Sequence, residues 1–349
     1  MNNRIEKIYK REYLKEHQFV IGADIGGTNS NIGIFEIKDE LPILLRSLHY
    51  KSQTITNFTL LFMEIFEYTK KMEIRVDILC IAAAGVVSEH REFVRPTNLQ
   101  TKINIKEIQK QTGIDCIYLA NDFEVISYGI QCIDQHNLIE IKKGIVRPKA
   151  NQAILGAGTG LGKCIMIWEK SREMHISSAS EGGHGDFAAQ IALDFDLINF
   201  IKKKEPEIDP VSWEDILSGN GIKRLYQFFQ MRFKESCDIT GPKPDEIFAK
   251  RDSNEAAQET VKYYAEIYAR CARNFALDSL CFGGLFIAGG IATHNIELFK
   301  TPWFVDHFTN NHKQKEILEE IPLTIIGDYN VSLYGAALYG LKEASCAKK

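Results

Sequence analysis

The sequence predicts an α/β protein made of two similar halves that face each other across a cleft. The first observation is a glycine-containing turn at residues 24–29 that connects two apolar runs. The second is a similar arrangement around the glycine-rich segment 156–162. The third is the pair Asn121 and Asp122, which directly follows the apolar run 116–120. In open α/β sheets, polar residues at the carboxyl end of a parallel strand line the ligand-binding crevice.

The first glycine turn lies at the tip of a predicted hairpin. Apolar runs over 19–23 and 32–37 flank it, and Ile32 and Ile34 recur at the period of two that is typical of strands. The dinucleotide fingerprint and the Walker loop both open a helix instead. A hairpin that begins with Asp24 and ends in Thr-Asn therefore indicates a different nucleotide-binding fold.

The other elements follow in order along the chain. Residues 1–17 are expected to form a short charged helix or arm. Strands are expected over 76–84, 116–120, 153–155, 164–168, 282–288 and 323–327. Helices are expected over 57–71, 103–111, 123–132, 188–203, 220–235, 254–279 and 333–342. The strand–glycine turn–strand pattern restarts near residue 152, which indicates a weak internal repeat. We expect a small α/β domain over 1–132 plus 327–349 and a large one over 133–326.

Composition limits the classes of function. Of 349 residues, 45% are hydrophobic and 25% charged, as in soluble globular proteins, and the net charge of −4 does not attract nucleic acid or anionic membranes. No apolar run reaches the ~18–20 residues of a membrane span. Residues 1–17 do not resemble a secretory leader, and the eight cysteines form neither CxxC pairs nor zinc spacings. A reducing, cytoplasmic location is the expectation.

The glycine turns suit phosphate binding, because backbone N–H groups approach a phosphate closely where no Cβ intervenes. Gly26 and Gly27 provide this in the first turn, and segment 158–160 (Gly-Thr-Gly) provides it in the second. Gly289 and Gly290 follow another buried strand. Any one such turn could also be a simple tight turn. The recurrence of the pattern favours a shared ligand.

Carboxylates accompany two of these features. Asp24 directly precedes the first turn, where a carboxylate beside phosphates needs a cation between them, so Mg²⁺ binding is expected; the alternative is a turn-stabilising Asp. Asp122 lies at a strand end, where it could accept a hydroxyl proton during phosphoryl transfer. The alternative for Asp122 is the N-cap of the following helix.

A polar cluster follows in the second half. Glu181 and His184 are separated by two glycines, and such a carboxylate and imidazole could bind several sugar hydroxyls. Glu214, three residues before Leu217-Ser218-Gly219, carries no signal by itself.

Together these motifs resemble the bacterial-type glucokinase family, part of the sugar kinase, actin and heat-shock chaperone ATPase superfamily. The similarity spans about residues 18–342. In order, its motifs match ADIGGTN at 23–29, Thr97-Asn98, Asn121-Asp122-Phe123, GAGTGLG at 156–162, Glu181 to Ala188, Glu214 before Leu217-Ser218-Gly219, and Phe286 to Ile291. One such motif is weak, but seven in order are specific.

The resemblance implies two ribonuclease H-like domains of the actin-like ATPase type, with ATP and Mg²⁺ as cofactors and a hexose as the other small-molecule partner. Asp122 would be the general base toward the sugar 6-hydroxyl. The sugar hydroxyls would be bound by Asn98, Asn121, Asp122, Glu181, His184 and Glu214. The phosphates and adenosine would be approached by Gly26, Gly27, Thr28, Asn29, Gly158, Thr159, Gly160, Gly289 and Gly290. Asp24 would serve the metal. A homodimer is expected by analogy, without nucleic-acid or membrane partners.

Alternatives remain open at this point. The same fold could phosphorylate mannose, fructose or an N-acetylhexosamine. A non-catalytic sugar sensor would need a DNA-binding head, for which 17 residues before the first strand are too few. An actin-like or chaperone-like ATPase would lack the Glu-His pair. The chain departs from the family where Gln100-Thr101-Lys102 replace a Trp-containing segment, and its N-terminal arm is longer. The cysteine-rich zinc motif of the related repressor and open-reading-frame kinase group is absent from the sequence.

Overall fold

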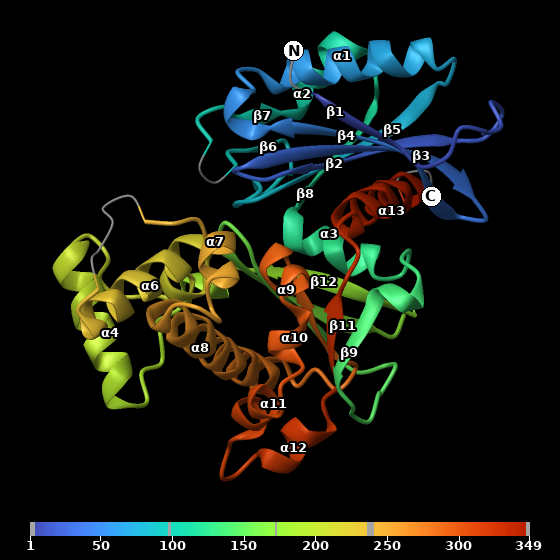
Figure 1. The fold of residues 1–349 in the computed structure, drawn as a ribbon. Helices are drawn as coiled ribbons and strands as arrows, with labels where there is room; N and C mark the ends of the chain where they lie inside the picture. Colours follow the sequence, from blue (N-terminus) through green and yellow to red (C-terminus); the bar gives the residue numbers. More distant parts are fainter. Residues whose placement is uncertain (1–3, 97–98, 172, 236–240, 347–349) are drawn as a thin grey trace. The chain divides into compact units, whose positions relative to one another are not determined.

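The computed structural model describes residues 4–96, 99–171, 173–235 and 241–346. The chain divides into two compact units (Figure 1). Unit 1 comprises residues 1–137 and 328–349, and unit 2 comprises residues 138–327.

Unit 1 is a six-stranded sheet with helices on both faces. The strands are β1 (Ile5–Ile8), β2 (Phe19–Ile25), β3 (Asn29–Lys38), β4 (Leu41–Lys51), β5 (Val76–Ala83) and β8 (Cys116–Asn121), in the order β1-β4-β3-β2-β5-β8. β1 to β4 pair antiparallel, whereas β2, β5 and β8 run parallel. β6 (Phe93–Val94) and β7 (Ile103–Asn104) form a separate two-stranded sheet, whose Val94 and Ile103 join the core of this unit.

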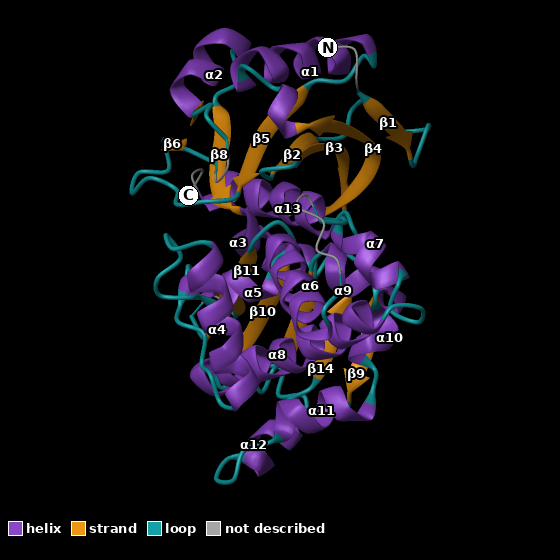
Figure 2. Cartoon of the chain, turned by 60° about the vertical axis from the view of Figure 1, so that its left-hand side comes forward, coloured by secondary structure: helices purple, strands orange, loops and turns teal. Residues whose placement is uncertain are grey.

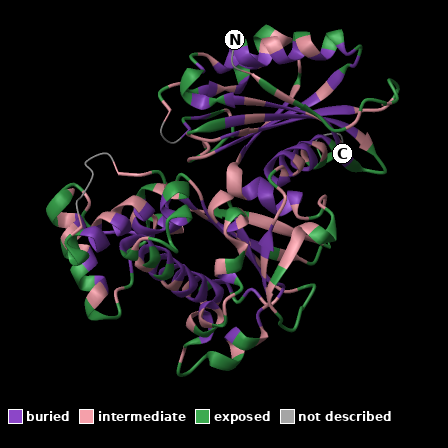
Figure 3. Ribbon diagram, in the orientation of Figure 1, coloured by how far each residue is buried: buried purple, intermediate pink, exposed green. Residues whose placement is uncertain are grey.

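The two faces of this sheet are covered by different helices. Figure 1 shows α1 (Phe58–Lys71) and α2 (Ile105–Thr112) on one face, with α3 (Asp122–Gly129) and α13 (Val331–Cys346) on the other. Because side chains alternate across a strand, Phe19 and Ile21 of β2 join the core under α1, while Val20 packs with Leu333 of α13. Figure 3 shows β2 and the inner side of α13 as buried.

Glycines allow α13 to approach its neighbours closely. A Cβ on Gly22 of β2 would lie 2.6 Å from the carbonyl oxygen of Leu333. A Cβ on Gly335 would lie 1.9 Å from the carbonyl oxygen of Val125 in α3. Since backbone atoms cannot yield, these contacts require glycine, and they fix α13 against β2 and α3.

Unit 2 is a second six-stranded sheet. Its strands are β9 (Leu138–Lys142), β10 (Gln152–Ala157), β11 (Leu161–Glu169), β12 (Met174–Ser180), β13 (Leu285–Ala288) and β14 (Leu323–Ile326), in the order β12-β11-β10-β13-β14-β9. Its helices are α4 (Ala192–Lys204), α5 (Trp213–Leu217), α6 (Gly219–Phe233), α7 (Pro244–Ala249), α8 (Glu255–Ser279), α9 (Gly290–His294), α10 (Ile296–Phe299), α11 (Pro302–Thr309) and α12 (Lys315–Glu320). Figure 2 shows helices of this unit lying in front of its strands.

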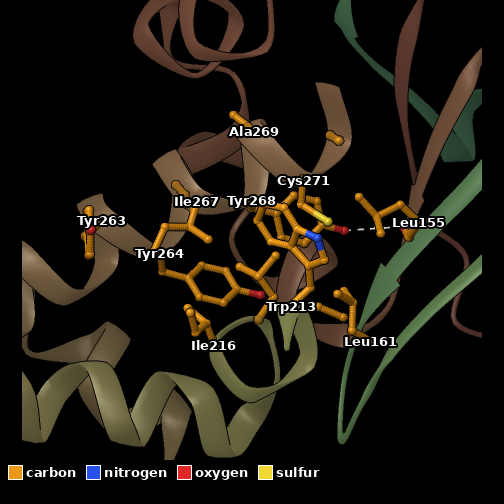
Figure 4. Packing of buried hydrophobic residues seen from close by; sticks show 14 of the residues in the cluster. Leu155, Leu161, Trp213, Ile216, Tyr263, Tyr264, Ile267, Tyr268, Ala269 and Cys271 are labelled. Carbon is orange, nitrogen blue, oxygen red and sulfur yellow. Dashed lines mark hydrogen bonds between the residues drawn. The ribbon is translucent and has the colours of Figure 1, made fainter. Parts of the chain in front are cut away.

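The core of unit 2 lies between α8 and the sheet. Tyr264, Tyr268 and Trp213 pack there with Leu155 of β10 (Figure 4). The Tyr268 hydroxyl donates to the carbonyl oxygen of Leu155 at 3.3 Å. This contact ties the longest helix described to the strand that leads into the second glycine turn.

The two sheets share one topology. In each, a three-stranded antiparallel meander (β4-β3-β2 or β12-β11-β10) continues through two parallel strands (β5-β8 or β13-β14). The repeat predicted from the two glycine turns is therefore confirmed at the level of strand order. β1 and β9 are additional edge strands.

The N-terminal arm contains no helix within residues 4–17. It forms β1 and then a loop that is fixed by buried Glu36, which accepts bonds from the side chain of Lys10 at 2.6 Å and the backbone N–H of Leu14 at 3.0 Å. The arm expectation holds and the helix alternative is wrong, because Glu36 and the β4 edge offer the arm tertiary partners. Within the described residues, no helix is long and apolar enough to cross a bilayer.

Candidate active site

The first glycine turn is a tight hairpin between β2 and β3. The N–H of Gly26 donates to the carbonyl oxygen of Asn29 at 3.0 Å. The turn is supported by the short 3₁₀ segment after β4, where the Ser52 hydroxyl donates to Gly26 O at 2.6 Å and the Gln53 amide donates to Gly27 O at 3.1 Å. Thr28 and Asn29 are exposed, so their polar groups can reach a ligand.

A cation lies at this turn that the sequence analysis missed. Lys51, the last residue of β4, pairs with Asn29 in the β3–β4 ladder. Its exposed ammonium group donates to Asn29 Oδ1 at 2.9 Å. No local pattern identifies Lys51, because its position depends on β4 pairing with β3 over 22 residues of sequence.

Asp24 lies beneath the turn, near the end of β2. The Ser332 hydroxyl of α13 donates to Asp24 Oδ2 at 2.6 Å. Burial raises the pKa of Asp24, and the serine hydrogen bond offsets only part of that effect. Among the described residues, no group of three or more His, Cys, Asp or Glu side chains could hold a metal. Mg²⁺ in proteins is usually bound through one or two carboxylates, with waters and substrate phosphates as its other ligands, so such a site requires no larger group.

Asn121 and Asp122 come at the junction of β8 and α3. In the parallel ladder Asp24 pairs with Ala82 of β5, which pairs with Ala120 of β8. Two strand spacings, about 10 Å, therefore separate the backbone at Asp24 from that preceding Asn121. The structure places the turn, Asp24 and Asp122 at one edge of the unit 1 sheet.

The cap of α3 is Asn121 rather than Asp122. Asn121 Oδ1 accepts from the N–H groups of Phe123 at 2.9 Å and Glu124 at 3.3 Å, and the Glu124 carboxylate accepts from the Asn121 N–H. The N-cap alternative for Asp122 is therefore wrong. Asn121 also donates one amide N–H to Gly85 O at 3.3 Å, and its NH₂ group carries a second.

Hydrogen bonds from Arg91 stabilise the β8–α3 junction, and the sequence analysis did not identify this residue. Arg91 donates to both carboxylate oxygens of Glu124 and to the carbonyl oxygen of Leu119. The role of Glu124 could have been predicted from the sequence, because an Asn followed three residues later by a Glu is typical of a capping box at the start of a helix. Arg91 lies 33 residues away, and no local pattern identifies it. Asn98 and its neighbour Thr97, also expected at the sugar, lie outside the described residues.

The second glycine turn joins β10 and β11 in unit 2. The Gly158 N–H donates to the carbonyl oxygen of Gly160 at 2.8 Å, and Thr159 is exposed at the tip. A Cβ on Gly158 would meet no atom within 4 Å, whereas one on Gly160 would lie 2.6 Å from Glu214 Oε2. The two glycines thus have different surroundings.

Glu181 and His184 are adjacent in space. Glu181 precedes the 3₁₀ turn Gly182–His184, and His184, its last residue, has Nε2 3.6 Å from Glu181 Oε2. Both side chains are 57% exposed. A carboxylate and an imidazole at this spacing offer acceptors and one N–H to neighbouring hydroxyls of a polyol.

Glu214 belongs to the same part of unit 2. It lies in the first turn of α5 and accepts the Leu161 N–H at 2.8 Å. The chain leading into α5 pairs with the segment after His184: the Trp213 N–H donates to Gly185 O and the Phe187 N–H to Val211 O. These bonds hold the Glu181–His184 turn and Glu214 together beside the second glycine turn.

Gly289 and Gly290 connect β13 to α9. Gly289 has φ of +94°, and a Cβ there would lie 2.3 Å from the carbonyl oxygen of Ala157 in β10. Close strand packing therefore explains this glycine. Beyond α9 the surface is hollowed by a pocket of about 390 Å³, lined in part by Phe248, Arg251 and His294. The sequence analysis did not identify these residues.

Comparison with known proteins shows that this chain is similar to glucokinases, both in a family model and in curated relatives. The family model described as Glucokinase matches residues 21–343. A glucokinase from Nostoc punctiforme is 32% identical over 342 residues, covering 91% of this chain and 98% of the relative. A glucokinase from Synechocystis sp. is 28% identical, covering 91% of this chain and 96% of the relative.

Solved structures share the fold. The crystal structure of glucokinase from an Antarctic psychrotroph superimposes with a TM-score of 0.78 at 24% identity, covering 93% of this chain and 99% of that one. Glucokinase from Balamuthia mandrillaris, solved with glucose, gives 0.75 at 20% identity, covering 93% and 94%. A ROK family glucokinase from Streptomyces griseus, solved with glucose and AMPPNP, gives 0.62 at 17%, covering 91% and 98%.

Proposed function

The chain belongs to the glucokinase family, and from this premise we propose that it transfers the γ-phosphoryl group of ATP to the 6-hydroxyl of glucose, with Asp122 as the general base. One observation carries the assignment of the base. At the β8–α3 junction Asn121 provides the helix cap, and the Asp122 carboxylate, whose Oδ1 accepts the Phe123 N–H at 3.1 Å, lies directly after the carboxyl end of β8.

The acceptor sugar would be bound by the polar residues that the family resemblance implies. In unit 2 these are Glu181, His184 and Glu214, which are held beside one another by the backbone bonds between segments 185–187 and 211–213. In unit 1 they are Asn121, Asp122 and Asn98. Ionised carboxylates accept hydrogen bonds from sugar hydroxyls, which favours a polyol over an apolar ligand.

The donor is assigned to the glycine turns. Gly26, Gly27, Thr28 and Asn29 of unit 1 and Gly158, Thr159 and Gly160 of unit 2 would approach the phosphates, as the family resemblance implies. The pocket beyond α9 supports a place for adenosine near Gly289 and Gly290, because it is lined by Phe248 together with polar Arg251 and His294.

Mg²⁺ would be held through Asp24, directly or through water. The ion would neutralise charge on the transferring phosphates. Asp24 fits this role because it lies near the end of β2 at the base of the turn, where the Ser332 hydroxyl donates to its carboxylate. The protein's own contribution is to bind and orient ATP and sugar, and to accept the hydroxyl proton on Asp122.

A cytoplasmic homodimer is part of this proposal. The scattered cysteines, none in a CxxC pair, favour a reducing compartment. The dimer rests on family analogy alone.

The test is a coupled assay of ADP release across glucose, mannose, fructose and N-acetylglucosamine. We expect strong dependence on glucose and a fall in kcat of at least ~100-fold in Asp122→Asn, the low end for loss of a general base. Asp115→Asn is the matched control, since Asp115 is exposed just before the opposite end of β8. ADP release that is equal without sugar would contradict the kinase assignment. Preference for another hexose would contradict the substrate alone.

A further inference from the structure

The two glycines of the second glycine turn are glycine for different physical reasons. Around Gly158 there is open space, since an added Cβ would meet no atom within 4 Å. Around Gly160 the space is filled by the Glu214 carboxylate, with Oε2 at 2.6 Å, Cδ at 3.2 Å and Oε1 at 3.6 Å from the position of a Cβ. The missing methyl group of Gly160 therefore leaves room for a side chain of the protein.

The Glu214 carboxylate is also held by the peptide group that follows Gly160. The N–H of Leu161 donates to Glu214 Oε2 at 2.8 Å. A carboxylate has two oxygens, each able to accept more than one hydrogen bond. With Oε2 turned to the Leu161 N–H, Oε1 lies farther from Gly160 and is the oxygen better placed to accept from a ligand hydroxyl.

The backbone of the same residue, Leu161, also supports the other acceptor residues of unit 2. A Cβ on Gly183 would lie 1.9 Å from the carbonyl oxygen of Leu161. The turn that carries Glu181 and His184 therefore packs directly on Leu161. Gly160 and Leu161 form a common support for three side chains assigned to the sugar.

The backbone around Glu214 cannot easily move away from Gly160. The N–H of Gly219, at the start of α6, donates to the carbonyl oxygen of Gly158 at 2.9 Å. The corner between α5 and α6 is thereby tied to the second glycine turn. A methyl group added at residue 160 would displace the end of the flexible Glu214 side chain rather than the backbone.

We propose that Gly160 is a positioning residue for the hexose, acting through the carboxylate of Glu214, and that Gly158 is the glycine of this turn that leaves space for the phosphates. The inference rests on the proposed function, because it assumes that Glu214 binds the sugar. For Gly160 it replaces the assignment to the phosphates that the family resemblance implies, whereas Gly158 keeps that assignment.

The test compares Gly160→Ala with Gly158→Ala, a matched pair in one turn. Glucose affinity is measured by calorimetry without nucleotide, and KM for ATP by the coupled assay at saturating glucose. Gly160→Ala should weaken glucose binding by about 10- to 100-fold, the range for a hydrogen bond to a charged group, and leave KM for ATP within about 3-fold. Gly158→Ala should raise KM for ATP and leave glucose affinity within about 3-fold.

A double-mutant cycle separates positioning from a general structural effect. Glu214→Gln alone should weaken glucose binding by about 10-fold or more. In the Gly160→Ala background the same change should cost less than about 3-fold, because the carboxylate is already displaced. Additive losses, or a Gly160→Ala protein with wild-type glucose affinity and raised KM for ATP, would overturn the inference. A wild-type protein that binds no glucose would overturn the proposed function and the inference with it.

Discussion

The guanidinium group of Arg91 donates to Glu124 through both of its terminal nitrogens, at 3.0 Å from Nη1 and 2.9 Å from Nη2. Nη1 also donates to the carbonyl oxygen of Leu119 at 3.0 Å. Arg91 therefore connects the end of β8 to the first turn of α3, on either side of Asn121 and Asp122. The Glu124 side chain is 9% exposed, so this contact fixes the junction within the protein.

Arg91→Ala should lower kcat by about 10-fold or more, because small displacements of a reacting group cost catalysis more than binding. The KM for glucose should change by less than about 3-fold. Steady-state kinetics check this, with Arg75→Ala as control, since the Arg75 side chain is 92% exposed. Arg91→Lys should recover only part of the rate, because lysine cannot form the two-nitrogen contact. An unchanged kcat in Arg91→Ala would show that Asp122 is positioned without this contact.

Lys51→Met should raise the KM for ATP by about 3- to 10-fold, because the variant loses a cation beside the first glycine turn. Lys38 is the control: it is exposed at the opposite end of β3 from Asn29, so Lys38→Met should leave all kinetic constants unchanged. Glucose binding without nucleotide should be the same in both variants. Equal KM values for ATP in the two variants would remove Lys51 from the donor site.

Asp24→Asn should raise the Mg²⁺ concentration for half-maximal rate by at least about 10-fold, since the variant loses the anionic oxygen assigned to the ion. A titration of rate against free Mg²⁺ at fixed ATP measures this. Calorimetry with glucose alone should show no change, which distinguishes a metal effect from misfolding. A Mg²⁺ dependence identical to that of the wild type would exclude Asp24 from this role.

Asp194→Asn should lower the free energy of unfolding by about 3–5 kcal/mol, the usual cost of breaking a buried ion pair on one side. Asp194 is fully buried in α4 and accepts from Arg270 at 2.7 and 3.0 Å, and from the Tyr263 hydroxyl. The control is Asp196→Asn in the same helix, whose ion pair with Arg232 is exposed and should contribute less than about 1 kcal/mol. Denaturant unfolding measures both. Equal losses in the two variants would contradict the burial argument.

The same pair predicts a pH dependence. Burial alone would raise the pKa of Asp194, but hydrogen bonds from Arg270, Tyr263 and the N–H groups of Gln190 and Ile191 outweigh it and hold the pKa below its ordinary value. A carboxyl whose pKa is lowered by folding contributes stability above its unfolded pKa of about 3.9 and loses it as pH falls further. The stability difference between wild type and Asp194→Asn should be constant above about pH 5 and shrink below about pH 4.

Sequence patterns predicted the strands next to the glycine turns but missed β4 and β12, which lie farther from the centre of each sheet. β2, β3, β10 and β11 were expected because buried apolar runs flank each turn. β4 was missed although it has 11 residues: its ladder with β3 shifts register near Phe35, so its apolar residues do not alternate regularly. β12 (MHISSAS) has little apolar content and forms by pairing with β11.

In the candidate site, too, local sequence predicted some features and missed others. The proximity of Glu181 and His184 follows from their three-residue spacing, and the place of Asp122 follows from a strand end. The contact of Gly160 with Glu214 and that of Arg91 with Glu124 join residues far apart in sequence. No local pattern encodes such contacts, since they depend on how strands and helices pack in three dimensions.

The added strand β1 affects the tendency of the protein to self-associate at high concentration. β1 pairs with His49, Leu48, Ser47 and Arg46 of β4, and so it occupies the backbone groups of what would otherwise be a long open edge. Its own outer edge is short and carries Glu6 and Lys7, charges that discourage further strand addition. A chain shortened to begin at Gln18 would expose β4 and leave Glu36 without Lys10. We expect such a chain to self-associate, which light scattering at rising protein concentration would detect. On this argument the N-terminal arm protects the edge of the unit 1 sheet from aggregation.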